Sequence, residues 1–137
     1  MPPPPHPANT ADRAIRQALS CLRETAATGT VRLMLVGELD LATADRAAKA
    51  LRRAQDETRE LVCDLGDVWF IDLSGLQVLL NAAVHAKRTG GELAVTNCPP
   101  IVPRMLRLLK LEDALDVQPA PRAAPSHGCA AIRRHVS

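Results

Sequence analysis

Alternating stretches of apolar and polar residues divide the chain into short candidate strands and helices. Continuous or period-two apolar runs predict strands, whereas apolar residues spaced three and four apart predict helices. The expected strands are 30–36, 61–65 (continuing past a turn or bulge at Gly66 and Asp67), 93–97 and 115–118. The expected helices are about 42–55, 74–88 and a third that Pro99 and Pro100 open. Residues 19–25 fit a weak strand, but a helix competes there because Ala14, Ala18 and Leu22 suit a 3.6-residue period.

The order of these elements, β-(β)-α-β-α-β-α-β, predicts an α/β fold. We expect a single domain with a mixed, mostly parallel β-sheet and packed helices. A chain of 137 residues has room for one such core. The folded body spans roughly 11–118. The flanking segments 1–10, a proline tract, and 119–137, rich in Pro, Ala and Arg, predict disordered tails.

Two local details of the pattern are also predictions. The run Gly37-Glu38-Leu39-Asp40 is expected to break the strand that precedes it. Trp69 and Phe70 are neighbours in a strand and should point to opposite faces, so at least one belongs to the core. Burial of both is the default expectation, and contact with a partner is the alternative.

Composition and charge exclude several classes of function. The chain has one Trp, one Phe and no Tyr, and it lacks the dense basic stripe typical of nucleic-acid binders. When the three arginines of 119–137 are set aside, 14 basic and 15 acidic side chains remain, so the body is near neutral. We therefore expect neither a nucleic-acid nor a membrane partner, and a cytoplasmic location. The four cysteines form no C-x-x-C pair, and we expect mostly buried thiols, no metal and no cofactor.

Ser74 is the most informative residue, because it lies between a strand-like run and a helical pattern. A serine at a helix start is close to unpaired N–H groups and the positive end of the helix dipole, where a phosphate is tolerated. The alternative is structural, since Asp and Ser before an apolar run are common helix caps. Gly75 fits both interpretations: it permits a tight turn and leaves Ser74 sterically open.

Four features in register resemble the STAS domain, the fold of bacterial anti-sigma factor antagonists. They are Gly37-Glu38-Leu39-Asp40, the run 64–72 (Asp-Leu-Gly-Asp-Val-Trp-Phe-Ile-Asp), Ser74-Gly75-Leu76, and Gly90-Gly91-Glu92-Leu93. The resemblance covers roughly 30–117. It implies a STAS-like α/β domain and a regulatory protein that is not an enzyme.

The resemblance also implies a partner and a site. In this family an anti-sigma factor, also a serine kinase of ATPase fold, is bound by the unmodified antagonist and phosphorylates the serine before Gly-Leu. By position Ser74 is the acceptor, Asp72 caps the helix and shapes the loop, and Asp40 lines the same face. The implied partner-binding residues are Asp40, Asp72, Leu73, Ser74, Gly75 and Leu76. Leu73 departs from the family's usual Asp-Ser-Ser-Gly-Leu. A monomer or weak dimer is expected.

Two other functions compete with this one. A STAS module without phosphorylation would serve as a scaffold, or as a ligand-binding or sensor module, and Leu73 leaves room for that hypothesis. Catalysis is disfavoured because Ser74 lies in no G-x-S-x-G elbow and the chain has no G-x-x-x-x-G-K-[ST] loop. His85, the histidine of the body, would lie about 16 Å along the same helix, beyond hydrogen-bond reach.

Overall fold

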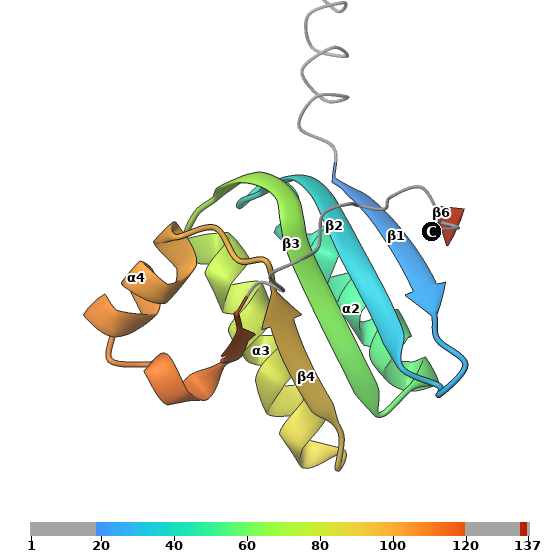
Figure 1. Ribbon diagram of the computed structural model, residues 1–137. Helices are drawn as coiled ribbons and strands as arrows, with labels where there is room; N and C mark the ends of the chain where they lie inside the picture. The colour runs from blue at the N-terminus through green and yellow to red at the C-terminus, as the bar shows by residue number, and fades with distance from the viewer. Residues whose placement is uncertain (1–18, 120–134, 137) are drawn as a thin grey trace, which may run out of the picture.

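In the part of the chain that the structure describes, six strands form one mixed sheet in the order β5-β4-β3-β2-β1-β6 (Figure 1). The computed structural model describes residues 19–119 and 135–136 of the chain. The strands are β1 (Ser20–Thr25), β2 (Val31–Leu39), β3 (Glu60–Ile71), β4 (Glu92–Thr96), β5 (Asp116–Gln118) and β6 (His135–Val136). Strands β2 to β5 pair in parallel, whereas β1 pairs antiparallel with β2 and with β6. The predicted mixed, mostly parallel α/β sheet is therefore confirmed.

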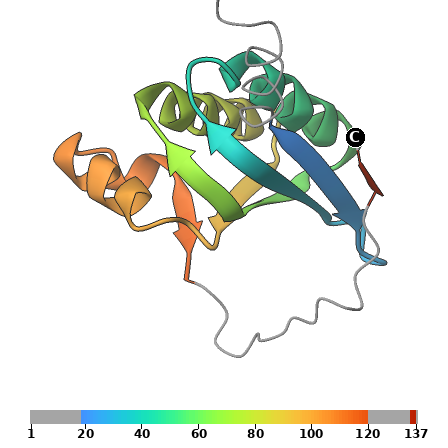
Figure 2. The same ribbon diagram turned by 90° about the horizontal axis from the view of Figure 1, so that it is seen from above.

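Helices α2 (Ala44–Glu57) and α3 (Leu73–Arg88) lie together on one face of the sheet, as Figure 2 shows from above. Helix α4 (Ile101–Leu108) lies beyond the β4 side of the sheet, and the short 3-10 helix η1 (Glu112–Ala114) contacts both α3 and α4. Parallel strands cannot be joined by a tight hairpin, so each of α2, α3 and α4 serves as the crossover between two of them. All three predicted helices are present.

The hydrophobic core lies between the sheet and helices α2 and α3. Side chains alternate along a strand, so every second residue of β2 and of the first half of β3 points toward these helices. The core is built from Leu, Val and Ala, including Val31, Leu33, Leu35, Leu39, Ala47, Leu51, Ala54, Leu61, Leu65, Leu76, Leu79, Ala83 and Ala86. Alanine at the helix contacts lets the two helices pack close to each other and to the sheet.

The first two strands decide two of the sequence predictions. Residues 20–25 form strand β1, which rules out the competing helix for that segment. Strand β2 does not break at Gly37 but runs on to Leu39, so that prediction was wrong. Gly37 has a φ of +126°, a conformation that glycine adopts without strain. The residue expected to end the strand therefore allows it to continue.

Strand β3 has two irregularities in its pairing with β2, and the second exposes both aromatic residues. Gly37 pairs with Val68, but the next residue, Glu38, pairs with Phe70, so Trp69 is an extra residue in β3. Such a β-bulge disturbs the alternation of side chains between the two faces. Trp69 is 65% exposed and Phe70 48%. The expectation that one or both lie in the core was wrong.

The sheet face opposite α2 and α3 carries a buried carboxylate, Asp64. Its side chain accepts hydrogen bonds from Arg32, from the Gly66 N–H (2.8 Å) and from Asn97 Nδ2 (3.1 Å). Burial opposes ionisation of Asp64, but the bonds from Arg32, Gly66 and Asn97 outweigh it and hold the pKa of the carboxyl below its ordinary value of 3.8. The ionised carboxylate thus links Arg32 on β2, the backbone of β3 at Gly66, and Asn97 directly after β4.

This network predicts a specific acid sensitivity. A carboxyl group with a lowered pKa stabilises the folded state above its unfolded pKa, about 3.9, and loses this as the pH falls through the folded value. We expect Asp64→Asn to destabilise the protein by about 2 kcal/mol at neutral pH, because it removes the charge that Arg32 faces. The gap to the wild type should stay constant above about pH 5 and close below about pH 4.

Urea unfolding midpoints of the two proteins at several pH values measure this gap. A gap that persists unchanged into acid would mean that Asp64 acts through its hydrogen-bonding oxygen, which the amide of Asn lacks, and not through its charge.

The cysteines of the described chain are structural. Cys21 in β1 and Cys63 in β3 are buried, as predicted, and Cys98 is half-buried. Burial, with a contribution from nearby Asp64, raises the pKa of the Cys98 thiol to about 11. These thiols therefore stay protonated near neutral pH and make poor nucleophiles.

The two ends of the chain lie largely outside the described residues, and the predicted tail 1–10 lies wholly outside them. Within the predicted tail 119–137, His135 and Val136 form strand β6 against β1, so for these two residues the structure differs from the expected disorder. In the described part of the chain no helix is both long and apolar enough to cross a bilayer.

Candidate functional site

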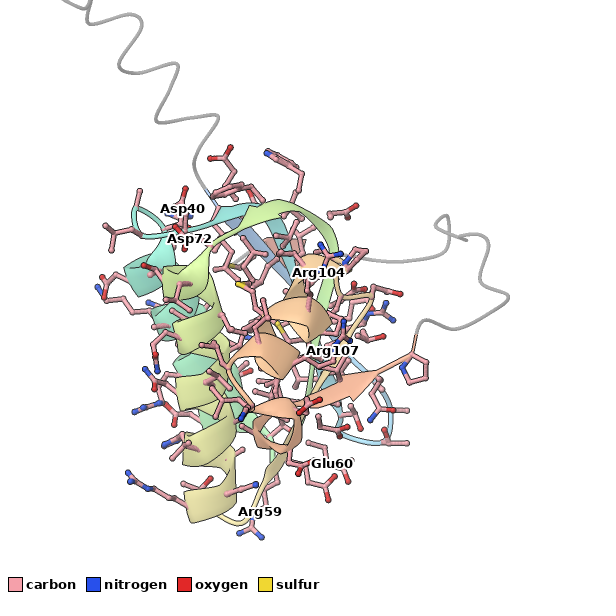
Figure 3. The ribbon with its side chains drawn as sticks, turned by 90° about the vertical axis from the view of Figure 1, so that its left-hand side faces the viewer. Asp40, Arg59, Glu60, Asp72, Arg104 and Arg107 are labelled. Atoms are coloured by element: carbon pink, nitrogen blue, oxygen red, sulfur yellow. The ribbon has the colours of Figure 1, made fainter. Side chains whose placement is uncertain are left out.

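Ser74 lies in the first turn of α3, at the end of the sheet where β2 and β3 finish. The Asp72 N–H donates to the carbonyl of Leu39 (3.2 Å), which joins the end of β2 to the start of α3. This bond brings the loop after Leu39 and the loop before Ser74 together, and Figure 3 shows Asp40 and Asp72 at this common end. The structure therefore gathers the predicted site residues at one end of the molecule.

Asp72, and not Ser74, caps the helix. Its Oδ1 accepts a hydrogen bond from the Gly75 N–H (3.1 Å), and its backbone is extended, as expected of an N-cap residue. Ser74 is half-buried, and no group among the described residues hydrogen-bonds its hydroxyl. The capping role implied for Asp72 is confirmed, and the hydroxyl of Ser74 is left available for other chemistry.

Gly75 is required by a close approach of α3 to the sheet. A Cβ at this position would lie 2.3 Å from the carbonyl oxygen of Leu39 and 2.7 Å from its Cγ. It would also lie 3.0 Å from Cγ1 of Ile71. The structure thus gives Gly75 a role that the sequence did not suggest, close packing against the end of β2, and its effect on access to Ser74 stays a prediction. Leu76 follows it into the core and is fully buried.

The loop after β2 is braced by Asp40 and Thr43. The Thr43 N–H donates to Asp40 Oδ1 (3.1 Å), the Asp40 N–H donates to Thr43 Oγ1 (3.0 Å), and that hydroxyl donates to the Glu38 carbonyl (2.7 Å). Thr43 is the N-cap residue of α2, although its side chain makes no capping bond to the helix. Asp40 therefore holds the loop in place, and Leu41 in that loop is left 77% exposed.

Sequence reasoning missed most of the apolar residues exposed at this end. Leu73 is expected on the surface and is 59% exposed. For Trp69 and Phe70 the sequence gives partner contact only as an alternative to burial, and it gives Leu41 no role. The signal that could have found Leu41 is its isolation between Asp40 and Ala42, outside any apolar periodicity. The exposure of Trp69 and Phe70 depends on the β-bulge, which the sequence pattern does not reveal.

The charged residues in the two segments at this end of the sheet are all acidic. Segments 37–45 and 66–77 contain five acidic residues and neither Lys nor Arg; the acids are Glu38, Asp40, Asp45, Asp67 and Asp72. Arg104 and Arg107 lie on α4, away from Asp40 and Asp72 (Figure 3). The charged side chains of the segments around Ser74 are therefore all negative, and neither segment supplies a Lys or Arg side chain.

The geometry does not favour catalysis by Ser74. His85 lies on the same continuous helix α3, eleven residues further on, which is roughly 16 Å at 1.5 Å per residue. A general base must lie within hydrogen-bond reach of the nucleophile. Among the described residues, no cluster of three or more His, Cys, Asp or Glu side chains is arranged to hold a metal ion.

Comparison with known proteins gives a consistent assignment. The STAS domain family matches residues 23–124. An anti-sigma F factor antagonist from Paenibacillus polymyxa is 37% identical over 82 residues, which cover 57% of this chain and 68% of that protein.

Solved structures share the fold. A Thermotoga maritima protein superimposes with a TM-score of 0.64 at 22% identity, covering 74% of this chain and 86% of its own. The phosphorylated form of the Bacillus cell fate determinant SpoIIAA superimposes with a TM-score of 0.59 at 19% identity, covering 74% and 92%.

Proposed function

Since this chain belongs to the STAS domain family, we propose that it is an anti-sigma factor antagonist whose binding is controlled by phosphorylation of Ser74. In its unmodified form it binds an anti-sigma factor that is also a serine kinase of ATPase fold, and this binding releases a sigma factor. Phosphorylated Ser74 ends the interaction. Anti-sigma factor antagonists of this family are regulatory proteins and not enzymes, which confirms the expectation for this chain.

The position of the Ser74 hydroxyl carries the proposal. It is half-buried in the first turn of α3, and Asp72 performs the capping that Ser74 would otherwise be needed for. The serine is thus held at a fixed place by Asp72, Gly75 and Leu76 without its own side chain contributing to the fold. A residue that is rigidly presented and chemically free is suited to modification.

A phosphate at this position acts on the complex more than on the fold. It adds a charge of about −1.5 to −2 and three strong acceptor oxygens. In the free protein the unpaired N–H groups and the dipole at the start of α3 offset part of the cost of this charge. In a closely packed complex the same group has to be desolvated and has no room, so the complex is weakened.

The first test is a capture experiment followed by a phosphorylation assay. Wild type, Ser74→Ala and Ser74→Asp are used as baits in extracts of the source cells, and the retained proteins are identified by mass spectrometry. We expect an ATPase-fold kinase with wild type and Ser74→Ala, but not with Ser74→Asp. The purified kinase, incubated with Mg-ATP, should add the mass of one phosphate to wild type and none to Ser74→Ala.

The scaffold or sensor alternative makes the opposite prediction. If all three baits retain the same proteins and no phosphate is added, Ser74 is not a control point. The departure at Leu73 would then mark a STAS module that works without phosphorylation.

A further inference from the structure

Four large apolar side chains are exposed at the end of the sheet where β2 and β3 finish and α3, with Ser74, begins. Leu41, Trp69, Phe70 and Leu73 are 77, 65, 48 and 59% exposed, and we refer to them as the apolar collar. They come from three places in the chain: the loop after β2, the end of β3 and the first residue of α3. Single exposed apolar residues are ordinary, but several gathered at one end of a domain mark an interaction surface.

The fold holds these side chains in exposed positions. The bulge at Trp69 turns both aromatic side chains outward, and the indole N–H of Trp69 reaches Glu38 Oε2 (3.4 Å). The Asp40–Thr43 bonds hold the loop that exposes Leu41, and the Asp72 cap fixes the helix that begins at Leu73. Preorganised aromatic and aliphatic side chains lose little conformational freedom on binding, which is typical of energetic hot spots.

The collar is bordered by carboxylates. Glu38, Asp40, Asp67 and Asp72 precede or lie between its members in the sequence, and segments 37–45 and 66–77 contain neither Lys nor Arg. We refer to these four acids as the acidic rim. A partner surface that complements this end has an apolar centre and Lys or Arg at its edge, because opposite charges favour encounter while the apolar contact supplies affinity.

We propose that the apolar collar is the main binding determinant for the anti-sigma factor kinase, and that the kinase surface which covers it is apolar at the centre and basic at the border. The proposal rests on the proposed function and deepens it by naming the residues that hold the partner. Ser74 follows Leu73 directly in the chain, so in this complex the kinase surface that covers Leu73 also covers Ser74.

The collar also explains how one phosphate can release a partner with a basic edge. Attraction between a phosphate and basic residues would by itself strengthen the complex. Within a contact that the collar keeps dry, however, the phosphate loses its hydration, and an unpaired buried charge is costly. The same apolar contact that gives affinity to the unmodified protein thus prevents the modified protein from binding.

Affinity measurements on matched variants test the collar. Leu41→Ser and Trp69→Ala are compared with Leu108→Ser, because Leu108 on α4 is also 77% exposed but lies outside the collar. The ligand is the purified ATPase-fold kinase with bound nucleotide, and binding is followed by calorimetry. We expect each collar variant to weaken binding by about tenfold or more and the Leu108 variant by less than about twofold.

Salt and fluorescence give independent readouts. Raising the salt concentration should weaken wild-type binding through the acidic rim, while the ratio of affinities of Leu41→Ser and wild type stays nearly constant. Trp69 is the chain's one tryptophan, and the chain has no tyrosine. When every tryptophan of the kinase is replaced with phenylalanine, the fluorescence of the complex comes from Trp69 alone. This fluorescence should shift to shorter wavelength on binding, because the indole leaves water.

The outcomes separate this proposal from the proposed function. If Leu41→Ser and Trp69→Ala bind like wild type while Ser74→Asp does not bind, the switch stands and the collar proposal is overturned. If the collar variants lose binding but Ser74→Asp retains it, the collar stands and the phosphorylation switch fails. Melting temperatures equal to wild type in every variant are required, which the exposure of these side chains leads us to expect.

Discussion

Phosphorylation of Ser74, or its replacement by Asp, should weaken binding of the anti-sigma factor kinase by about 30-fold or more, because an unpaired charge enters a dry contact. The free energy of unfolding should change by no more than about 1 kcal/mol, since a negative charge in the first turn of α3 is favoured by the helix dipole. Neighbouring Asp40 and Asp72 oppose part of that gain. Calorimetric binding and urea unfolding on the same samples measure the two effects.

The control for this prediction places the same charge elsewhere on the helix. Asn81→Asp adds one carboxylate two turns further along α3, at an exposed residue that accepts a hydrogen bond from Gln77 through Oδ1, which Asp retains. Its affinity for the kinase should stay within about twofold of wild type. A similar loss in both variants would indicate general repulsion, and a large loss of stability in Ser74→Asp would mean that the substitution acts by unfolding α3.

The sequence was sufficient for the fold because its signals were periodic and local. Apolar runs and 3.6-residue spacing marked β2, β3, β4 and all three helices, and parallel pairing followed from their alternation. The candidate site was predicted for a similar reason, since Asp72, Ser74 and Gly75 lie close together in the sequence at a strand–helix junction. Asp40 was placed at the same end only through the family resemblance.

What could not be read from the sequence depends on contacts between distant residues. The bulge at Trp69 arises from the register between β2 and β3, so no local pattern announces that Trp69 and Phe70 both face outward. The strand was expected to stop at Gly37 because glycine commonly marks a turn, yet pairing with β3 carries β2 on to Leu39. The exposure of the two aromatic members of the apolar collar depends on this pairing and is visible only in the folded chain.

Gly75→Ala should destabilise the protein by about 2–4 kcal/mol, although alanine is intrinsically the better helix former by about 1 kcal/mol. The new Cβ would lie 2.3 Å from the Leu39 carbonyl oxygen, the same atom that accepts the Asp72 N–H, so the start of α3 has to move away from β2. The opposing atom belongs to the backbone of β2, which can move only slightly, so this contact is more costly than one with a flexible side chain.

Ser74→Ala, one residue earlier and half-buried, is the matched control and should change stability by less than about 0.5 kcal/mol. Urea midpoints decide the matter: a Gly75→Ala protein as stable as wild type would show that the junction can shift, and that the glycine beside Ser74 is retained for access of the kinase and not for packing.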